Sequence, residues 1–165
     1  MTNALKAEIE AWIEADPDPR DRARLAESLA QAEAGDTAAQ AELAAAFAGP
    51  LAFGTAGLRG ELGPGPARMN RAVVIRAAAG LMAYLDEVIR PPARAVTDPG
   101  SPAPAEPASL PSSAAPKVVI GYDARRGSRD FAVDTAAVVT AAGGRALLWE
   151  QTCPTPLLAY AVREL

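Results

Sequence analysis

The sequence lacks histidine and contains a single cysteine, and both features exclude classes of chemistry. Without histidine, the chain can form neither a Ser-His-Asp triad nor a Cys-His nucleophile pair, and it loses the commonest general base and metal ligand. A single cysteine, Cys153, excludes an internal disulfide, and no Cys/His cluster exists for zinc. The chain therefore has no histidine-dependent nucleophile and no zinc site of this kind.

Aromatic residues, long apolar runs and positive charge are also scarce. Aromatic residues make up 5% of the chain, whereas half of its residues are apolar, and many of these are alanine, which favours helix. No apolar run reaches the ~20 residues that span a bilayer, and the N-terminus carries acidic residues within its apolar stretch, unlike a signal peptide. The net charge of −4 argues against a nucleic-acid partner. We therefore expect a cytoplasmic globular protein with neither a membrane nor a nucleic-acid partner.

Residues 1–50 are expected to form a helical N-terminal extension of three short helices. Apolar residues recur at helical spacing along residues 4–48. Asp18 is expected to cap the second helix with Pro19 at its first position, and Asp36 is expected to cap the third.

Residues 51–165 show the strand and helix alternation of a parallel α/β domain. Short apolar runs predict strands at 51–53, 118–120 and 146–149, and caps predict helices starting at Asn70, Ser128 and Thr155. The predicted fold class is thus α/β, an incomplete three-layer parallel-sheet domain preceded by a helical extension. Since the chain stops at Leu165 after a helix, we expect the domain to be partial and its sheet to lack a following strand.

Residues 91–116 differ in kind from the rest of this domain. Eight of the 26 residues are proline, and most of the others are alanine or serine. Such a segment buries too little apolar surface to offset the entropy of ordering it. We interpret it as a disordered insertion within the domain, because the flanking segments complete one pattern.

Two glycine-containing segments could bind an anion. In Phe53–Gly60, FGTAGLRG, Gly57 lets the backbone approach a ligand, while Thr55 adds a hydroxyl and Arg59 a fork of donors suited to phosphate. In Gly121–Ser128, GYDARRGS, Asp123 could orient Arg125 or a neighbouring backbone amide, and Ser128 lies at a predicted helix start. On spacing alone, a tight bend with a surface arginine is the simpler explanation of the first segment, and a helix cap with solvated arginines explains the second equally well.

A third segment, Cys153–Pro156, reads by itself as a turn from a strand into a helix. The three segments could all lie at the carboxyl edge of one sheet, where open α/β folds bind ligands. Arg59 and Arg125, joined by Arg68 or Arg126, would then converge on an anion. This pattern indicates a phosphorylated small molecule as the ligand.

The same three segments resemble motifs of the α-D-phosphohexomutase superfamily, which contains phosphoglucomutases and phosphomannomutases. FGTAGLRG is similar to the opening motif of the family, GYDARRGSRDFA to its next strand, loop and helix, and CPTPLLAYAV to its P-T-P helix. They occur in the family's order, and the resemblance covers residues 51–90 and 117–165. The N-terminal helices resemble the longer branch of the superfamily, which includes phosphopentomutases.

The resemblance implies most of domain I of a four-domain phosphosugar mutase, an isomerase of carbohydrate metabolism. Such enzymes move a phosphoryl group between the C1 oxygen and the C6 or C5 oxygen of a phosphorylated hexose or pentose. A phosphoserine that binds Mg²⁺ donates the group, a bisphosphate intermediate follows, and a glucose 1,6-bisphosphate type of activator is implied for the full enzyme.

The resemblance also assigns roles to residues of this chain. Arg59 matches the catalytic arginine that faces the phosphoserine; Thr55 and Gly57 share its loop, with Arg125 on the phosphate-binding side and Asp123 and Ser128 in the wall of the site. The T-A-S-H-N-P motif that carries the catalytic serine does not occur in these 165 residues, nor does the family's metal loop. We therefore expect the chain to be inactive without the missing C-terminal domains, which are its implied partners.

Two other functions remain open from the sequence. The chain could be a non-enzymatic α/β module that binds phosphate or a protein, or a helical interaction protein built on residues 4–48. The coding sequence beyond residue 165 discriminates them, because a T-A-S-H-N-P motif there would identify the mutase.

Overall fold

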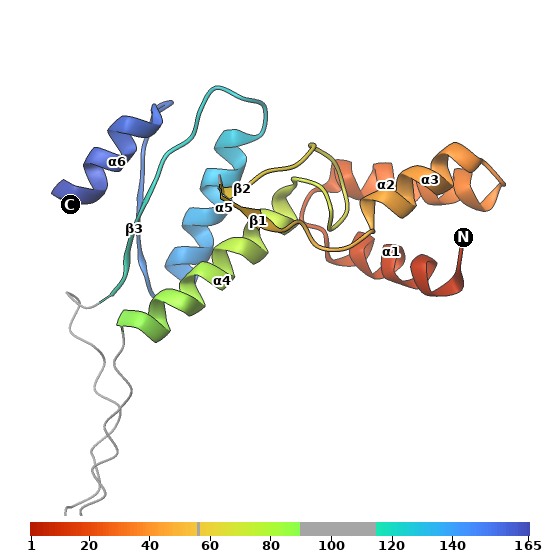
Figure 1. Cartoon of the computed structure of the whole chain (residues 1–165), viewed down its shortest axis with the longest axis horizontal. Coiled ribbons are helices and arrows are strands. Elements are labelled where there is room, and N and C mark those ends of the chain that lie inside the picture. Colours follow the sequence, from red (N-terminus) through yellow and green to blue (C-terminus); the bar gives the residue numbers. More distant parts are fainter. Residues whose placement is uncertain (56, 90–114) are drawn as a thin grey trace, which may run out of the picture. The chain divides into compact units, whose positions relative to one another are not determined.

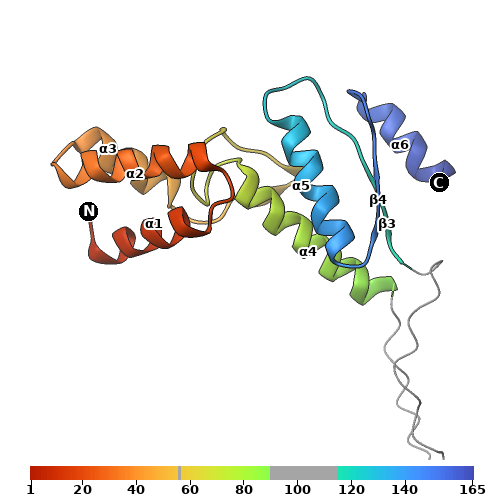
Figure 2. The same ribbon diagram turned by 180° about the vertical axis from the view of Figure 1, so that it is seen from behind.

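The computed structural model describes residues 1–55, 57–89 and 115–165, which form two compact units, Met1–Arg76 and Ala77–Leu165 (Figures 1 and 2). Each unit contains its own hydrophobic cluster. The predicted insertion at 91–116 lies outside the described residues, except for its last two positions.

The first unit begins with three helices, α1 (Asn3–Ala15), α2 (Pro19–Glu33) and α3 (Thr37–Ala46) (Figure 1). The carboxylate of Asp18 accepts a hydrogen bond from the Arg20 amide at 2.9 Å, and Pro19 follows at the first helical position. Asp36 accepts hydrogen bonds from the amides of residues 38 and 39. The two predicted caps are confirmed, because each side chain satisfies amides that have no partner within the helix.

Trp12 occupies the core of the first unit. Its side chain is buried, and its indole nitrogen donates a hydrogen bond to Asp16 Oδ2 at 3.0 Å. Its ring meets that of Phe47 edge-on with 6.0 Å between centroids, and the Arg76 guanidinium lies 4.3 Å from the ring centroid. The other buried residues of this cluster come from all three helices and from the start of α4 (Arg71–Ile89): Ile9, Leu25, Leu29, Ala32, Ala39, Leu43, Ala46, Ala72 and Val73.

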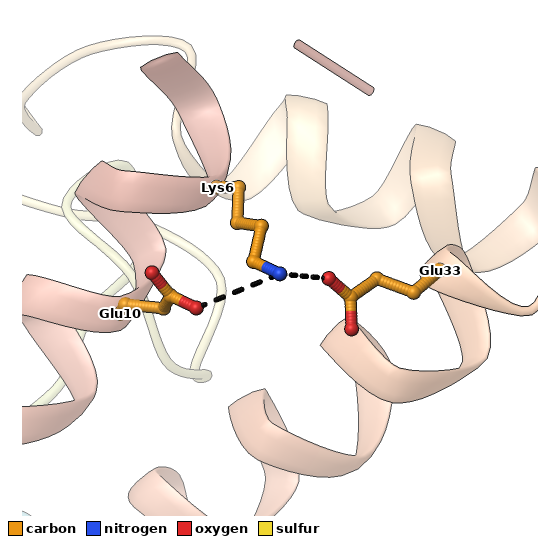
Figure 3. A network of polar contacts seen from close by, with 3 residues as sticks. All are labelled: Lys6, Glu10 and Glu33. Carbon is orange, nitrogen blue, oxygen red and sulfur yellow. Dashed lines mark hydrogen bonds and ion pairs between the residues drawn. The ribbon is translucent and has the colours of Figure 1, made fainter. Parts of the chain in front are cut away.

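A surface network joins α1 to α2 (Figure 3). The Lys6 ammonium is ion-paired with Glu33 of α2 and lies 3.8 Å from Glu10 Oε1 on its own helix. The hydrogen bond from Lys6 to Glu33 is the main cause that raises the pKa of the lysine. Because these side chains are solvated, their pairing contributes far less than the apolar contacts beneath them.

The rest of the first unit consists of a hairpin, a loop and the beginning of α4 (Arg71–Ile89), which continues into the second unit. Strands β1 (Phe53–Gly54) and β2 (Gly57–Leu58) pair antiparallel, with Phe53 opposite Leu58. Asn70 caps α4, as the sequence predicts: its Oδ1 accepts a hydrogen bond from the Val73 amide at 2.9 Å.

The second unit has a parallel strand pair, β3 (Lys117–Ile120) and β4 (Arg145–Leu148), in the register Lys117 to Arg145. Helix α5 (Ser128–Ala141) lies on one side of the pair and α6 (Thr155–Glu164) on the other, as both ribbon views show (Figures 1 and 2). The buried cluster of this unit joins Met82 of α4, Ile120 of β3, and Ala132 and Val139 of α5. This is the three-layer α/β arrangement that the sequence predicts.

One detail of the predicted sheet is wrong. Within the described residues, the parallel sheet contains two strands rather than three: of the segment expected as its first strand, 51–53, only Phe53 lies in a strand, and it pairs with Leu58 in the antiparallel β1-β2 hairpin. Each hairpin strand contributes only two paired residues. The last pair before the turn is Gly54 with Gly57, and glycine allows the backbone to reverse there within two residues. The helices described between residues 1 and 165 include none that is long and apolar enough to span a membrane.

Candidate functional site

The FGTAGLRG segment forms a tight hairpin whose turn depends on glycine. Gly54 lies opposite Gly57, which has a φ of +84°. A Cβ on Gly57 would meet no atom within 4 Å, so the backbone conformation and not the available space favours glycine there. Thr55 is exposed in the turn.

Arg59 follows β2 directly and is exposed. Among the described residues it forms no hydrogen bond or ion pair, whereas nearby Arg68 is ion-paired with Glu61 and is partly buried. A guanidinium without a partner among the described residues keeps its donors available to an anion. Arg59 thus fits the predicted role in phosphate binding better than Arg68, whose charge is already compensated.

The GYDARRGS segment forms a compact turn between β3 and α5, closed by the Asp123 carboxylate. Asp123 Oδ1 accepts a hydrogen bond from the Arg125 amide at 3.0 Å, and Oδ2 lies 3.3 Å from Arg125 Nε. The Asp123 amide donates to Ser128 Oγ at 3.2 Å. Asp123 therefore orients Arg125, as expected from the sequence, and Arg125 keeps an exposed side chain.

Ser128 does not cap α5, contrary to the prediction. Gly127, with a φ of +80°, is the residue that precedes the helix, and no side chain caps it. The Ser128 hydroxyl instead accepts the hydrogen bond of the Asp123 amide. Ser128 thus belongs to the wall of the turn, because its hydroxyl bonds the Asp123 amide within the loop and no amide at the start of α5.

The stability of this turn should decrease in acid, because its Asp123 carboxylate is stabilised in the charged form. The Arg125 amide, followed by the Ser128 hydroxyl and the Arg125 charge, lowers the pKa of Asp123 below its ordinary value of about 3.9. A lowered native pKa contributes stability above the ordinary pKa, and that contribution is lost as the pH falls through the native pKa.

We expect carboxyl-carbon chemical shifts to place the Asp123 midpoint below pH ~3.9, with Arg125 amide protection lost over the same range. In Asp123→Asn, which keeps the acceptor oxygen and removes the charge, the pH dependence of that protection should vanish. An Asp123 midpoint at or above the ordinary value would contradict this account of the turn.

The CPTP segment lies against the GYDARRGS turn. The Cys153 amide donates to the Tyr122 carbonyl at 2.8 Å, and the Tyr122 hydroxyl donates to the Glu150 carbonyl at 2.7 Å. Two of the three sequence motifs are therefore neighbours at the carboxyl ends of β3 and β4, as parallel pairing requires. Pro154, not Thr155, precedes α6 without a side-chain cap, which corrects the predicted Thr155 cap.

The predicted site residues thus form two groups, each with its own geometry. Thr55, Gly57 and Arg59 belong to the hairpin of the first unit, and Asp123, Arg125 and Ser128 belong to the turn of the second. Their convergence on one ligand stays a prediction. In the described part of the chain, no three Asp, Glu or Cys side chains lie together as metal ligands.

Sequence reasoning assigned Asn70 only the role of a helix cap. The structure adds three contacts from its side-chain nitrogen to carbonyls of the preceding loop. The signal was available in the sequence, because Asn70 ends a glycine- and proline-rich loop that has no other side-chain amide.

The second unit is a three-layer α/β domain whose loop between β3 and α5 carries the exposed Arg125. Residues 107–165 match the family model described as phosphoglucomutase/phosphomannomutase, alpha/beta/alpha domain I. Over these residues the chain is similar to this family.

Curated relatives match far beyond that segment. The whole chain is 32% identical to a probable phosphoribomutase of Schizosaccharomyces pombe, of which it covers 24%, and 30% identical to a phosphopentomutase of Mus musculus, of which it covers 23%. A phosphoglucomutase of Staphylococcus haemolyticus is 34% identical over 72% of the chain and 17% of its own length. The chain thus spans a quarter or less of the length of these relatives. The search of solved structures found no significant match.

Proposed function

We propose that this chain forms the N-terminal part, including most of domain I, of a phosphosugar mutase. The whole protein would move phosphate between the C1 oxygen and the C6 or C5 oxygen of a phosphorylated hexose or pentose. The single observation that carries the proposal is the match of the whole chain to a probable phosphoribomutase and a phosphopentomutase, alongside a phosphoglucomutase that matches 72% of the chain. We also propose residues 1–50 as a helical extension and 51–165 as the partial domain.

The chemistry of phosphoryl transfer agrees with what the chain offers. Such transfer needs little covalent help from the protein and depends on positioning and on stabilisation of charge. We assign the latter role to Arg59, whose guanidinium is exposed and unpaired among the described residues. Arg125, held by Asp123, is proposed to bind phosphate, and Thr55 and Gly57 shape the loop that presents Arg59.

The remaining parts of the reaction are assigned to segments outside this chain. The phosphoserine would come from a T-A-S-H-N-P segment, which does not occur in these 165 residues. Magnesium, when bound there, would neutralise charge on the phosphoryl group, and none of the described residues is proposed as its ligand.

The purified 165-residue chain is expected to show no mutase activity, because it offers no phosphoserine as donor. Coupled assays with glucose 1-phosphate and with ribose 1-phosphate, each with a bisphosphate activator and Mg²⁺, test this. The full-length protein serves as the positive control and should convert at least one of the two sugars. Turnover by the purified chain would show that its own residues suffice, and inactivity of the full-length protein toward every phosphosugar would refute the proposed function.

A further inference from the structure

Asn70 uses its side chain for more than the cap of α4. The side chain is 3% exposed, and its Oδ1 accepts the hydrogen bond of the Val73 amide, which is all that a cap requires. Its Nδ2 contacts the carbonyl oxygens of Gly63, Gly65 and Arg68 at 2.9, 2.8 and 3.3 Å. One buried amide therefore holds together the loop of residues 61–69, which we call the anchoring loop.

The anchoring loop in turn holds both ends of the arginine-bearing hairpin. On the incoming side, the Leu51 amide donates to the Pro66 carbonyl at 2.8 Å. On the outgoing side, the Met69 amide donates to the Glu61 carbonyl, also at 2.8 Å. Glu61 is two residues beyond Arg59, so the first backbone hydrogen bond described after the arginine belongs to this loop.

The anchoring loop is also attached to the helical core of the first unit. The Ala67 amide donates to the Ala46 carbonyl at the end of α3, at 3.0 Å. Gly65, with a φ of +102°, packs so closely that a Cβ there would lie 2.8 Å from the same carbonyl oxygen. Only glycine combines this backbone angle with this approach. The hairpin base is thereby tied to the helices, while its tip stays exposed.

We propose that Asn70 is a positioning residue for Arg59: its buried amide fixes the anchoring loop and so the base from which Arg59 projects. This inference rests on the proposed function, since it gives Asn70 a role in turnover. The effect acts through geometry, because small displacements of a group that stabilises a transition state are costly, with ~1 Å lowering rates roughly 100-fold. Asn70 itself need touch no substrate.

Asn70→Asp removes the hydrogen bonds to the anchoring loop and keeps the cap of α4. A carboxylate still accepts the Val73 hydrogen bond and suits the helix N-terminus, but it cannot donate and would face three carbonyl oxygens. In the full-length protein we expect kcat to fall roughly 10- to 100-fold with little change in KM. Amide exchange at Leu51 and Met69 should accelerate. Asn70→Ser, whose hydroxyl can also cap, replaces the aspartate variant if that variant does not fold.

Asp36→Ala is the matched control, because it removes a helix cap of the same unit that has no contact with the anchoring loop. It should lower thermal stability while leaving kcat and the exchange at Leu51 and Met69 unchanged. A double-mutant cycle adds the decisive readout: in an Arg59→Ala background, Asn70→Asp should lower kcat little further.

Each outcome decides a separate point. Unchanged exchange at Leu51 and Met69 in Asn70→Asp would overturn the anchoring. Faster exchange with an unchanged kcat, or additive losses in the cycle, would overturn the positioning role while the proposed function stands. A full-length wild-type protein without mutase activity would instead refute the proposed function, and the role in turnover with it.

Discussion

Arg59→Ala in the full-length protein is expected to lower kcat roughly 100- to 1,000-fold, the effect typical of removing a donor that stabilises transition-state charge. The loss should fall on kcat and on kcat/KM alike, if the arginine acts on charge that develops during transfer. The free energy of unfolding should change by no more than about 0.5 kcal/mol, because the side chain is exposed and unpaired among the described residues.

Steady-state kinetics and urea unfolding measure these two quantities on the same samples. Arg59→Lys keeps the charge and removes the fork of donors, so an intermediate kcat is expected. Arg20→Ala, at an exposed arginine of α2, controls for the loss of one surface charge and should retain full activity. Full activity of Arg59→Ala would reduce the arginine to a residue of the bend.

Trp12→Ala is expected to destabilise the first unit by about 3–5 kcal/mol, a large share of the stability of an ordinary domain. The substitution removes the buried ring, its edge-on contact with Phe47 and the surface beneath the Arg76 guanidinium. It also removes the indole donor to Asp16, a side chain that is 1% exposed. Urea unfolding followed by helical circular dichroism should show this loss.

Trp12→Phe separates the contribution of the indole hydrogen bond from that of the aromatic packing. Phenylalanine keeps an aromatic ring beside Phe47, but it leaves Asp16 Oδ2 without its indole donor. The loss of a hydrogen bond to a buried group costs about 1–3 kcal/mol, so this variant should lie between the wild type and Trp12→Ala. A loss below about 1 kcal/mol in Trp12→Ala would mean that the helical core does not depend on this side chain.

The sequence allowed the prediction of those elements whose signals are local. Asp18 with Pro19, Asp36 and Asn70 each mark a helix start, because a side-chain oxygen reaches an amide only two or three residues away. The apolar runs at 118–120 and 146–149 mark β3 and β4 to within one residue, since a strand covered on both faces needs apolar side chains at consecutive positions.

The tertiary structure decided the features that depend on distant partners. Whether Ser128 caps α5 or accepts the Asp123 amide depends on the path of the preceding turn, and a cap rule does not contain that path. The hairpin around Arg59 pairs with itself rather than joining the parallel sheet, and its base is held by residues 61–69. Glycine permits many backbone paths, so contacts outside the segment select one of them.

By itself, the sequence determined the chemical groups of the candidate site: two arginines beside glycine-rich turns, no histidine, and helix starts set by short polar side chains. The tertiary structure decided which of Arg59 and Arg68 is left without a partner among the described residues, and what holds it in place. Arg68 is ion-paired with Glu61, whereas Arg59 is exposed. The side-chain amide of Asn70 holds the loop of residues 61–69, which follows Arg59 in the chain. Residue type sets what a group can bind, whereas availability depends on neighbours that only folding brings together.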